Sequence, residues 1–180
     1  MKWSEITFDD PRLEAKTGLQ IRGKYTFERW SPWGTRICRT EFYNDIVNEG
    51  LNHILNVQFY GATQITTWYL GLIGGSSVTI DEDDTSASHS GWTEDTNYSE
   101  STRQAWSPAE STGELSRNTS PVRYTMDAQT TIRGLFITSS SVAANDATGT
   151  LWSAAVLDAV QAVSIGESLK CYYELYALDG

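Results

Sequence analysis

Two histidines and several groups of carboxylates are the side chains of this sequence that could do chemistry. A serine or cysteine hydrolase needs a nucleophile, a histidine beside it and a carboxylate that orients the histidine. The histidines are His53 and His89, and the sequence contains no Gly-x-Ser-x-Gly pattern. Neither histidine is spaced from a second histidine or a cysteine as zinc ligands are. We therefore expect neither a hydrolase triad nor a zinc site.

The densest acidic cluster lies at residues 81–84, where four carboxylates in a row could attract a hard cation such as Ca²⁺. A calcium loop of the EF-hand type would need an acidic or amide residue at its fifth position and glycine at its sixth. This sequence has Thr85 and Ser86 at those positions. The segment is better explained as a solvated acidic loop in which Asp84 caps a short helical turn over residues 85–89.

Paired carboxylates such as Glu94 with Asp95, or Glu110 with Glu114, could be fitted to the mechanism of a glycosidase. Carboxylates in a polar, loop-like stretch are usually solvated, and we expect these to be so. The glycine-rich segment 71–77 is followed by no lysine that could reach a phosphate group. We therefore expect no enzyme activity, no bound cofactor and no metal site.

Aromatic residues are the other functional candidates, because the 180 residues include seven tryptophans and nine tyrosines. Trp92, Tyr98 and Trp106 are spaced through a polar, aperiodic stretch, which we expect them to anchor, with Arg103 stacked on an aromatic face. Trp33 lies at a predicted hairpin turn, where its ring could anchor a protein interface or stack on a sugar. We take these five residues as candidate subunit-interface or loop anchors.

Strand patterns account for most of the chain. Apolar residues alternate from residue 19 to 28, and a turn at 31–34 leads to a second strand over 35–43. The continuous apolar run at 66–73 predicts a strand buried on both faces. Further strands are predicted over 122–126, 130–138, 151–157 and 168–178. Because the turns between these last strands are short, they favour antiparallel pairing.

The sequence predicts a mainly β fold, an antiparallel β-sandwich or jelly-roll with one short amphipathic helix. The helix is expected over residues 44–55, with Asn44 and Asp45 as its N-cap pair. Residues 1–18 are expected to form an extended N-terminal arm, or alternatively an edge strand. Residues 19–180 would then be a single domain with a long loop at about 74–120.

The chain is strongly acidic, since 13 basic and 23 acidic residues give a formal net charge of −10. This charge repels the phosphate backbone of nucleic acid. No apolar run approaches the roughly 18 residues of a membrane-spanning helix, and the first residues lack the apolar segment of a signal peptide. We expect a soluble protein, made in a cytoplasm, whose partners are neither nucleic acid nor a membrane. Cys38 and Cys171 are expected to be free thiols.

Several segments resemble a recurring family of small virion proteins of tailed bacteriophages. The resemblance is carried first by residues 68–73 (WYLGLI), 86–94 (SASHSGWTE) and 98–106 (YSESTRQAW). It continues with GLFI at 134–137, GTL at 149–151 and GESL at 166–169. The segments YTF at 25–27 and NDIVNEGL at 44–51 are similar to the opening of such proteins. The resemblance covers about residues 44–178 most closely, and residues 1–18 have no matching motif.

The resemblance implies a β-sandwich or jelly-roll subunit of the phage particle. The most specific expectation is a capsid decoration or cement protein that bridges subunits of the major capsid protein or other virion proteins. Such a protein would form a homo-oligomer and be found in the virion after assembly in the host cytoplasm. Two alternatives stay open, a head-fibre or tail-associated module that contacts host glycans and, less simply, a glycan hydrolase.

Overall fold

The computed structural model describes residues 19–144 and 148–179. Within them the chain is mainly β, with two antiparallel sheets and one short α-helix, which confirms the predicted fold class and is consistent with a β-sandwich. The predicted N-terminal arm, residues 1–18, lies outside the described residues. The elements are β1 (Leu19–Trp30), β2 (Arg36–Ile46), α1 (Asn48–Leu55), the π-helix η1 (Asn56–Tyr60), β3 (Trp68–Gly74), β4 (Thr93–Asp95), β5 (Gln104–Trp106), β6 (Leu115–Arg117), β7 (Val122–Thr125), β8 (Thr130–Thr138), β9 (Leu151–Val163) and β10 (Ser168–Asp179).

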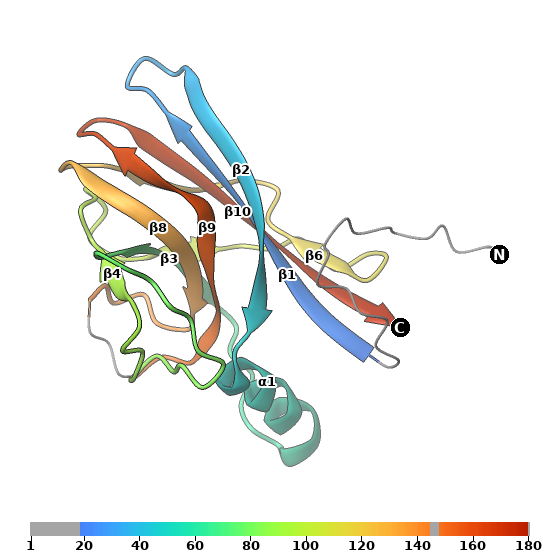
Figure 1. Cartoon of the computed structure of the whole chain (residues 1–180). Helices are drawn as coiled ribbons and strands as arrows, with labels where there is room; N and C mark the ends of the chain where they lie inside the picture. The colour runs from blue at the N-terminus through green and yellow to red at the C-terminus, as the bar shows by residue number, and fades with distance from the viewer. Residues whose placement is uncertain (1–18, 145–147, 180) are drawn as a thin grey trace.

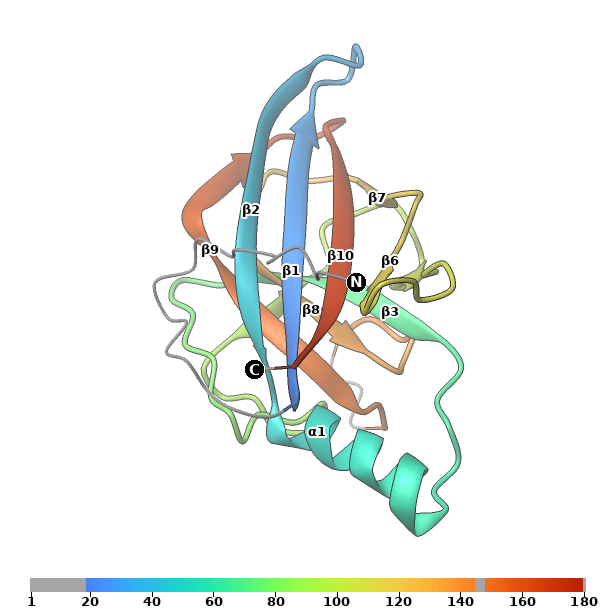
Figure 2. The same cartoon turned by 90° about the vertical axis from the view of Figure 1, so that its right-hand side faces the viewer.

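The strands form two facing layers (Figures 1 and 2). We call the layer with the order β2-β1-β10 sheet A; β6 and β7 pair with β10 at its edge. Sheet B has the order β9-β8-β3, with β4 and β5 paired to β3. The end of β2 joins the layers, because its last two residues, Asp45 and Ile46, pair with β9. A continuous ladder therefore runs through both sheets.

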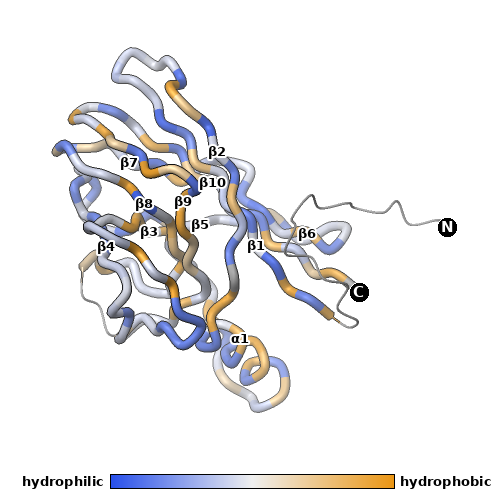
Figure 3. The backbone as a smooth tube through the Cα atoms, in the orientation of Figure 1, coloured by the Kyte–Doolittle hydropathy of each residue, from blue (hydrophilic) through white to orange (hydrophobic). Residues whose placement is uncertain are grey.

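The core lies between the two sheets. Because successive side chains of a strand point to opposite faces, every second side chain of a strand points into this core. On β1, Tyr25 and Phe27 point inward and are fully buried, while Lys24 lies on the opposite face. Fully buried side chains of each layer meet there, among them Leu70, Leu72, Ile132, Leu135, Leu169 and Tyr173. Each such side chain contributes roughly 1.5–3 kcal/mol by leaving water. Figure 3 shows hydrophobic positions on the strands of both layers.

A second, smaller cluster covers the outer face of sheet B. It is made of Val47, Ile73, Trp92, Phe136, Leu151 and Ala154, with Val78 and Ile80 packed against it. Residues 78–92, which precede β4, supply Val78, Ile80 and Trp92. This stretch is part of the predicted long loop, and its apolar side chains pack on the outer face of sheet B and cover it.

The predicted helix begins later than the sequence indicated. Residues 44–46 are the end of β2, and α1 starts at Asn48 with Val47 at the N-cap position and no side-chain cap. The predicted capping by Asn44 and Asp45 is therefore wrong. The competing interaction is the pairing of Asp45 and Ile46 with β9, which keeps these residues extended.

The segment predicted as a loop at 74–120 contains three strands of three residues each. The first two, β4 and β5, extend sheet B beside β3, and β6 lies at the edge of sheet A beside β10. The segment thus crosses from one layer to the other and contributes backbone pairing to both.

Candidate interaction surfaces

Three of the five predicted anchors are buried aromatic side chains of the 74–120 segment itself. Trp92 packs on Phe136 at 4.9 Å between ring centroids, and its Nε1 donates a hydrogen bond of 2.9 Å to Asp84 Oδ2. Trp106 Nε1 donates to Asn118 Oδ1 and to the carbonyl oxygen of Tyr173, both at 3.2 Å. These rings fasten the segment to sheet B and to β10, respectively.

Tyr98, the third aromatic anchor, is also buried and packs on Tyr124 at 4.4 Å between ring centroids. Burial raises the pKa of Tyr98 above its ordinary value, and the nearby charge of Glu94 acts in the same direction. The phenol is therefore protonated at neutral pH and serves in packing.

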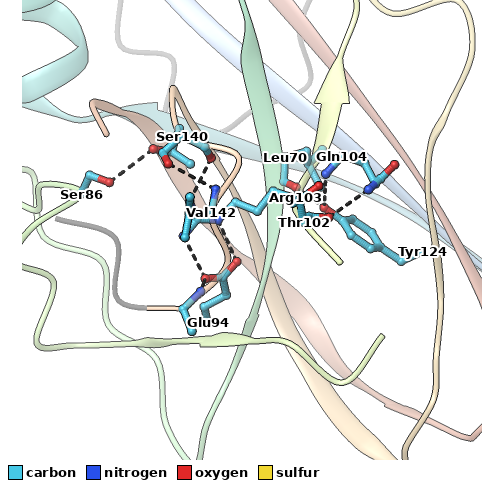
Figure 4. Close-up of polar contacts among 11 residues, drawn as sticks. Leu70, Ser86, Glu94, Thr102, Arg103, Gln104, Tyr124, Ser140 and Val142 are labelled. Carbon is cyan, nitrogen blue, oxygen red and sulfur yellow. Dashed lines mark hydrogen bonds and ion pairs between the residues drawn. The ribbon is translucent and has the colours of Figure 1, made fainter. Parts of the chain in front are cut away.

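Arg103, the fourth candidate, forms a buried ion pair with Glu94 (Figure 4). Its Nε donates to Glu94 Oε1 at 2.8 Å and its Nη2 donates to Oε2 at 2.9 Å. Its Nη1 donates to the carbonyl oxygen of Ser140 at 2.9 Å, and the guanidinium carbon lies 5.2 Å from the ring centroid of Phe136. The guanidinium thus makes three hydrogen bonds and lies over an aromatic ring. Such an arrangement fixes the side chain in place and is typical of a residue that stabilises the fold.

Of the carboxylates that a glycosidase scheme would use, Glu110 and Glu114 are exposed as expected, but Glu94 and Asp95 are buried, contrary to expectation. Glu94 is occupied by Arg103 and also accepts from the backbone nitrogen of Ala144 at 2.7 Å. Asp95 is buried and accepts hydrogen bonds from the backbone nitrogen of Asn97 and from the Thr130 hydroxyl. Both carboxylates therefore hold neighbouring segments together.

In the acidic segment 81–84, Asp84 differs from the prediction that it lies in a solvated loop and caps a helical turn. Asp84 is buried, and residues 85–89 form no helical turn for it to cap. Its Oδ2 accepts from Trp92 Nε1 and from the backbone nitrogen of Asp81 at 3.0 Å. Asp81, Glu82 and Asp83 are exposed, as expected of an acidic loop.

The histidines make aromatic contacts. His89 stacks on Trp92 at 3.8 Å between ring centroids, and its Nδ1 lies 3.2 Å from the Trp92 carbonyl oxygen. His53 meets Trp68 edge-on at 5.8 Å. Within residues 19–144 and 148–179, no three His, Cys, Asp or Glu side chains converge as metal ligands would. Cys38 and Cys171 are free.

Trp33, the fifth candidate, is exposed at the tip of the β1–β2 hairpin. The turn is closed by a hydrogen bond of 3.0 Å from the Gly34 nitrogen to the Ser31 carbonyl oxygen. Gly34 has a φ of 81°, which favours glycine. The side chain of Trp33 is 89% exposed. Of the five predicted residues, it alone is available to a partner in the structure as described.

A second exposed apolar surface lies on α1 and η1 and was not predicted. We call it the helix-tip patch; its members and their exposed fractions are Leu51 (38%), Leu55 (55%), Phe59 (80%) and Tyr60 (85%). Leu51, Leu55 and Phe59 are four residues apart and so lie along one side of the helix. Gly50 instead faces sheet B, where a Cβ would approach the Trp152 carbonyl oxygen to 2.6 Å. The spacing of four is a sequence signal for one apolar side of a helix, but it does not say whether that side is packed or exposed.

The hairpin tip with Trp33 and the helix-tip patch lie at opposite ends of the sandwich (Figure 1). No protein-family model matches this sequence, and no curated protein matches it significantly. None of the described helices has the length and apolar character needed to cross a membrane.

Proposed function

We propose that the protein is a non-catalytic structural protein of a tailed-phage particle, most specifically a decoration or cement protein of the capsid. One observation supports this most directly: large apolar side chains are exposed at two opposite ends of a β-sandwich. These are Trp33 at the hairpin tip and the helix-tip patch around Phe59. Exposed aromatic groups of this kind anchor protein interfaces.

Two separate anchor points suit a subunit that bridges others. A protein that contacts one capsid subunit through Trp33 and a second through Phe59 would gain affinity from both contacts, and a symmetric lattice would repeat the gain. The protein would then be found in the virion as a homo-oligomer, with the major capsid protein or another virion protein as its partner. The resemblance in segments 68–73, 86–94 and 98–106 supports the same assignment.

The buried polar groups support a structural role over catalysis. Glu94, Arg103 and Asp84 are buried charged side chains of types that catalytic sites use. Each of them is held by hydrogen bonds within the fold. A catalytic acid or base must reach a substrate proton, and these groups are occupied by internal partners.

The test is cosedimentation of the purified protein with capsids assembled without it. Trp33→Ala and Phe59→Ala should each lower the amount bound, because each removes an exposed ring, while the thermal unfolding midpoint stays unchanged. Val142→Ala is the control, since Val142 is 56% exposed and is part of neither the hairpin tip nor the helix-tip patch. Equal binding of all three variants would contradict the role of the two ends, and failure of the unchanged protein to bind capsids or tails would contradict the virion assignment.

The predicted role of residues 1–18 is tested in the same assay. If these residues reach a neighbouring subunit, a protein without residues 1–16 should fold and bind capsids more weakly. Unchanged occupancy on particles would exclude that role.

A second candidate function is the binding of host glycans by a head-fibre or tail-associated module. The exposure of the Trp33 ring favours it, because flat aromatic rings stack on sugars. A glycan array should then show binding that Trp33→Ala abolishes and Trp33→Phe partly keeps. Capsid cosedimentation with no glycan binding would decide for the decoration role.

A further inference from the structure

The end of the sandwich that carries Trp33 exposes apolar side chains from two neighbouring turns. Trp33 lies in the β1–β2 turn, and Ile37, which is 44% exposed, follows it on β2. The β9–β10 turn lies beside this hairpin, because a Cβ on its Gly166 would approach Pro32 Cγ to 3.4 Å. Ile165 of the same turn is 67% exposed. We call the surface made of Pro32, Trp33, Ile37 and Ile165 the hairpin end.

The charges beside the hairpin end leave it slightly basic. Residues 28–41 and 163–170 contain four basic and three acidic side chains. Each of the three acids is paired with an arginine of the same segments, in the ion pairs Glu28–Arg36, Glu41–Arg39 and Glu167–Arg29. Lys170 forms no ion pair within the described chain, and its Nζ lies 3.3 Å from the centroid of the Trp30 ring. The surplus charge at this end is therefore positive, in a protein whose net charge is −10.

The helix-tip patch at the opposite end lies beside charges of the other sign. Residues 44–60 and 78–85 contain six acids and neither lysine nor arginine. Of these acids, Asp81, Glu82 and Asp83 are exposed. Asp81 and Glu82 line the same groove as Leu51 of the patch, and Asp83 Oδ1 accepts a hydrogen bond of 2.8 Å from Asn48 Nδ2 on α1. The two ends thus share exposed apolar side chains and differ in the sign of their charge.

We propose that the hairpin end of one copy of this chain binds the helix-tip patch of a second copy, head to tail. Trp33 of one copy would pack against Phe59 and Tyr60 of the next, so that each end removes exposed rings of the other from water. The positive surplus of the hairpin end would meet the exposed acids of residues 81–83. Because the two contact surfaces differ, the interface is heterologous, and its repetition gives a closed ring or an open chain of subunits.

Contacts between like ends are less favourable for an electrostatic reason. Two helix-tip patches brought together would place the acids of residues 81–83 of one copy near those of the other. Two hairpin ends would bring together two copies of Lys170 and of the half-exposed Arg36. Contact between opposite ends avoids both repulsions. The apolar side chains therefore supply the attraction, and the charges select the head-to-tail orientation.

This proposal names a second copy as a partner for the same two ends that the proposed function assigns to capsid contacts. It rests on the exposure and the charge of those ends and needs no capsid. The two contacts use the same side chains, so each end holds one partner at a time. Self-association is therefore tested on the purified protein alone, and its failure would leave the capsid contacts to be decided by cosedimentation.

The first measurement is sedimentation velocity of the purified full-length protein over a wide range of concentrations. In low salt the average sedimentation coefficient should rise with concentration, and added salt should reduce this rise because it screens the charges. Trp33→Ala disables one end and Phe59→Ala the other, so each variant alone should associate at least about tenfold more weakly. An equal mixture of the two variants should form dimers, since each variant keeps the end that the other has lost.

The mixture separates head-to-tail contact from contact between like ends. If two hairpin ends bound each other, Phe59→Ala alone would still associate as the unchanged protein does, and if two helix-tip patches did, Trp33→Ala alone would. Glu82→Lys should also weaken association, whereas Glu110→Lys, the same charge change at an exposed residue outside both ends, should change it little. A monomer at all concentrations, a mixture that sediments as two monomers, a single variant that associates normally, or equal effects of Glu82→Lys and Glu110→Lys would each overturn the proposal.

Discussion

Arg103 and Glu94 face one another in a two-pronged ion pair whose side chains are only 5% and 6% exposed. Glu94 belongs to β4, Arg103 directly precedes β5, and the third hydrogen bond of the guanidinium reaches Ser140, which follows β8. A single pair of charges thus fixes three segments that are distant in sequence. The opposite charges satisfy each other, so the pair stabilises the fold only while both members are present.

Removal of one member of this pair should be strongly destabilising. We expect Glu94→Gln and Arg103→Met each to lower the free energy of unfolding by about 3–5 kcal/mol, because each leaves a buried group without its partner. The double variant should lose less than the sum of the two single losses. Chemical denaturation of the three variants measures these differences.

The matched control is the exposed pair Arg39 and Glu41, whose side chains are 48% and 42% exposed. Arg39→Gln should cost no more than about 1 kcal/mol, since water screens this pair. Similar losses from Arg103→Met and Arg39→Gln would contradict the structural role of the buried pair.

Asn118 should be a second point of weakness, because its amide joins three parts of the chain. Its Oδ1 accepts from Trp106 Nε1 at 3.2 Å and from the Tyr173 backbone nitrogen at 2.9 Å. Its Nδ2 donates to the carbonyl oxygens of Ser120 at 2.8 Å and Cys171 at 3.3 Å. We expect Asn118→Leu to lower the free energy of unfolding by about 2–4 kcal/mol, because it leaves several buried partners unsatisfied.

Asn118→Asp serves as the comparison, since it keeps the acceptor and loses the donor. Its loss of stability, read from thermal unfolding at neutral pH, should reflect the unpaired carbonyl oxygens and the buried charge. Asn52→Leu, on the exposed side of α1, should change the unfolding midpoint little. Equal midpoints for Asn118→Leu and Asn52→Leu would contradict the bridging role.

Acid should remove a contribution to stability that comes from Glu174. Burial alone would raise the pKa of Glu174, but hydrogen bonds from Lys24 and Tyr176 outweigh it and leave the pKa below the ordinary value of 4.5. Because the folded state binds this proton less tightly than the unfolded state does, the contribution is present above pH 4.5. It is lost as the pH falls through the lower pKa of the folded state.

The difference between the unchanged protein and Glu174→Gln measures this contribution. Near neutral pH the variant should be less stable, and the gap in unfolding free energy should narrow as the pH falls below 4.5. Glu110→Gln, at an exposed position, should show no comparable gap. A gap between the unchanged protein and Glu174→Gln that is constant from neutral to acid pH would contradict the linkage.

The strands were predictable because their signals are local. Alternation along residues 19–28 and the apolar run at 66–73 correspond to β1 and β3, each with its inward face buried. The short strands β4, β5 and β6 were not predicted. A run of three residues carries too little periodicity, and each of these strands exists because β3 or β10 offers it a partner.

The state of the acidic residues was not predictable for a related reason. Glu94 and Asp84 lie in polar sequence, and their burial depends on Arg103 and Trp92, partners that only the folded chain brings to them. The end of β2 follows the same rule, because pairing with β9 overrides the capping preference of Asn44 and Asp45. Local composition indicates solvation correctly where the side chain stays at the surface, as that of Glu82 does.

Asp84 should control the segment that covers the outer face of sheet B. Its buried carboxylate accepts from Trp92 Nε1 at 2.9 Å and from the Asp81 nitrogen at 3.0 Å. Asp84→Ala leaves both donors unsatisfied, and we expect a loss of about 2–3 kcal/mol together with faster amide exchange in residues 78–92. Glu82→Ala removes the same charge from an exposed position and should leave exchange there nearly unchanged. If both variants speed amide exchange in residues 78–92 equally, the negative charge of the loop, and not the hydrogen bond to Trp92, keeps this segment packed on the sheet.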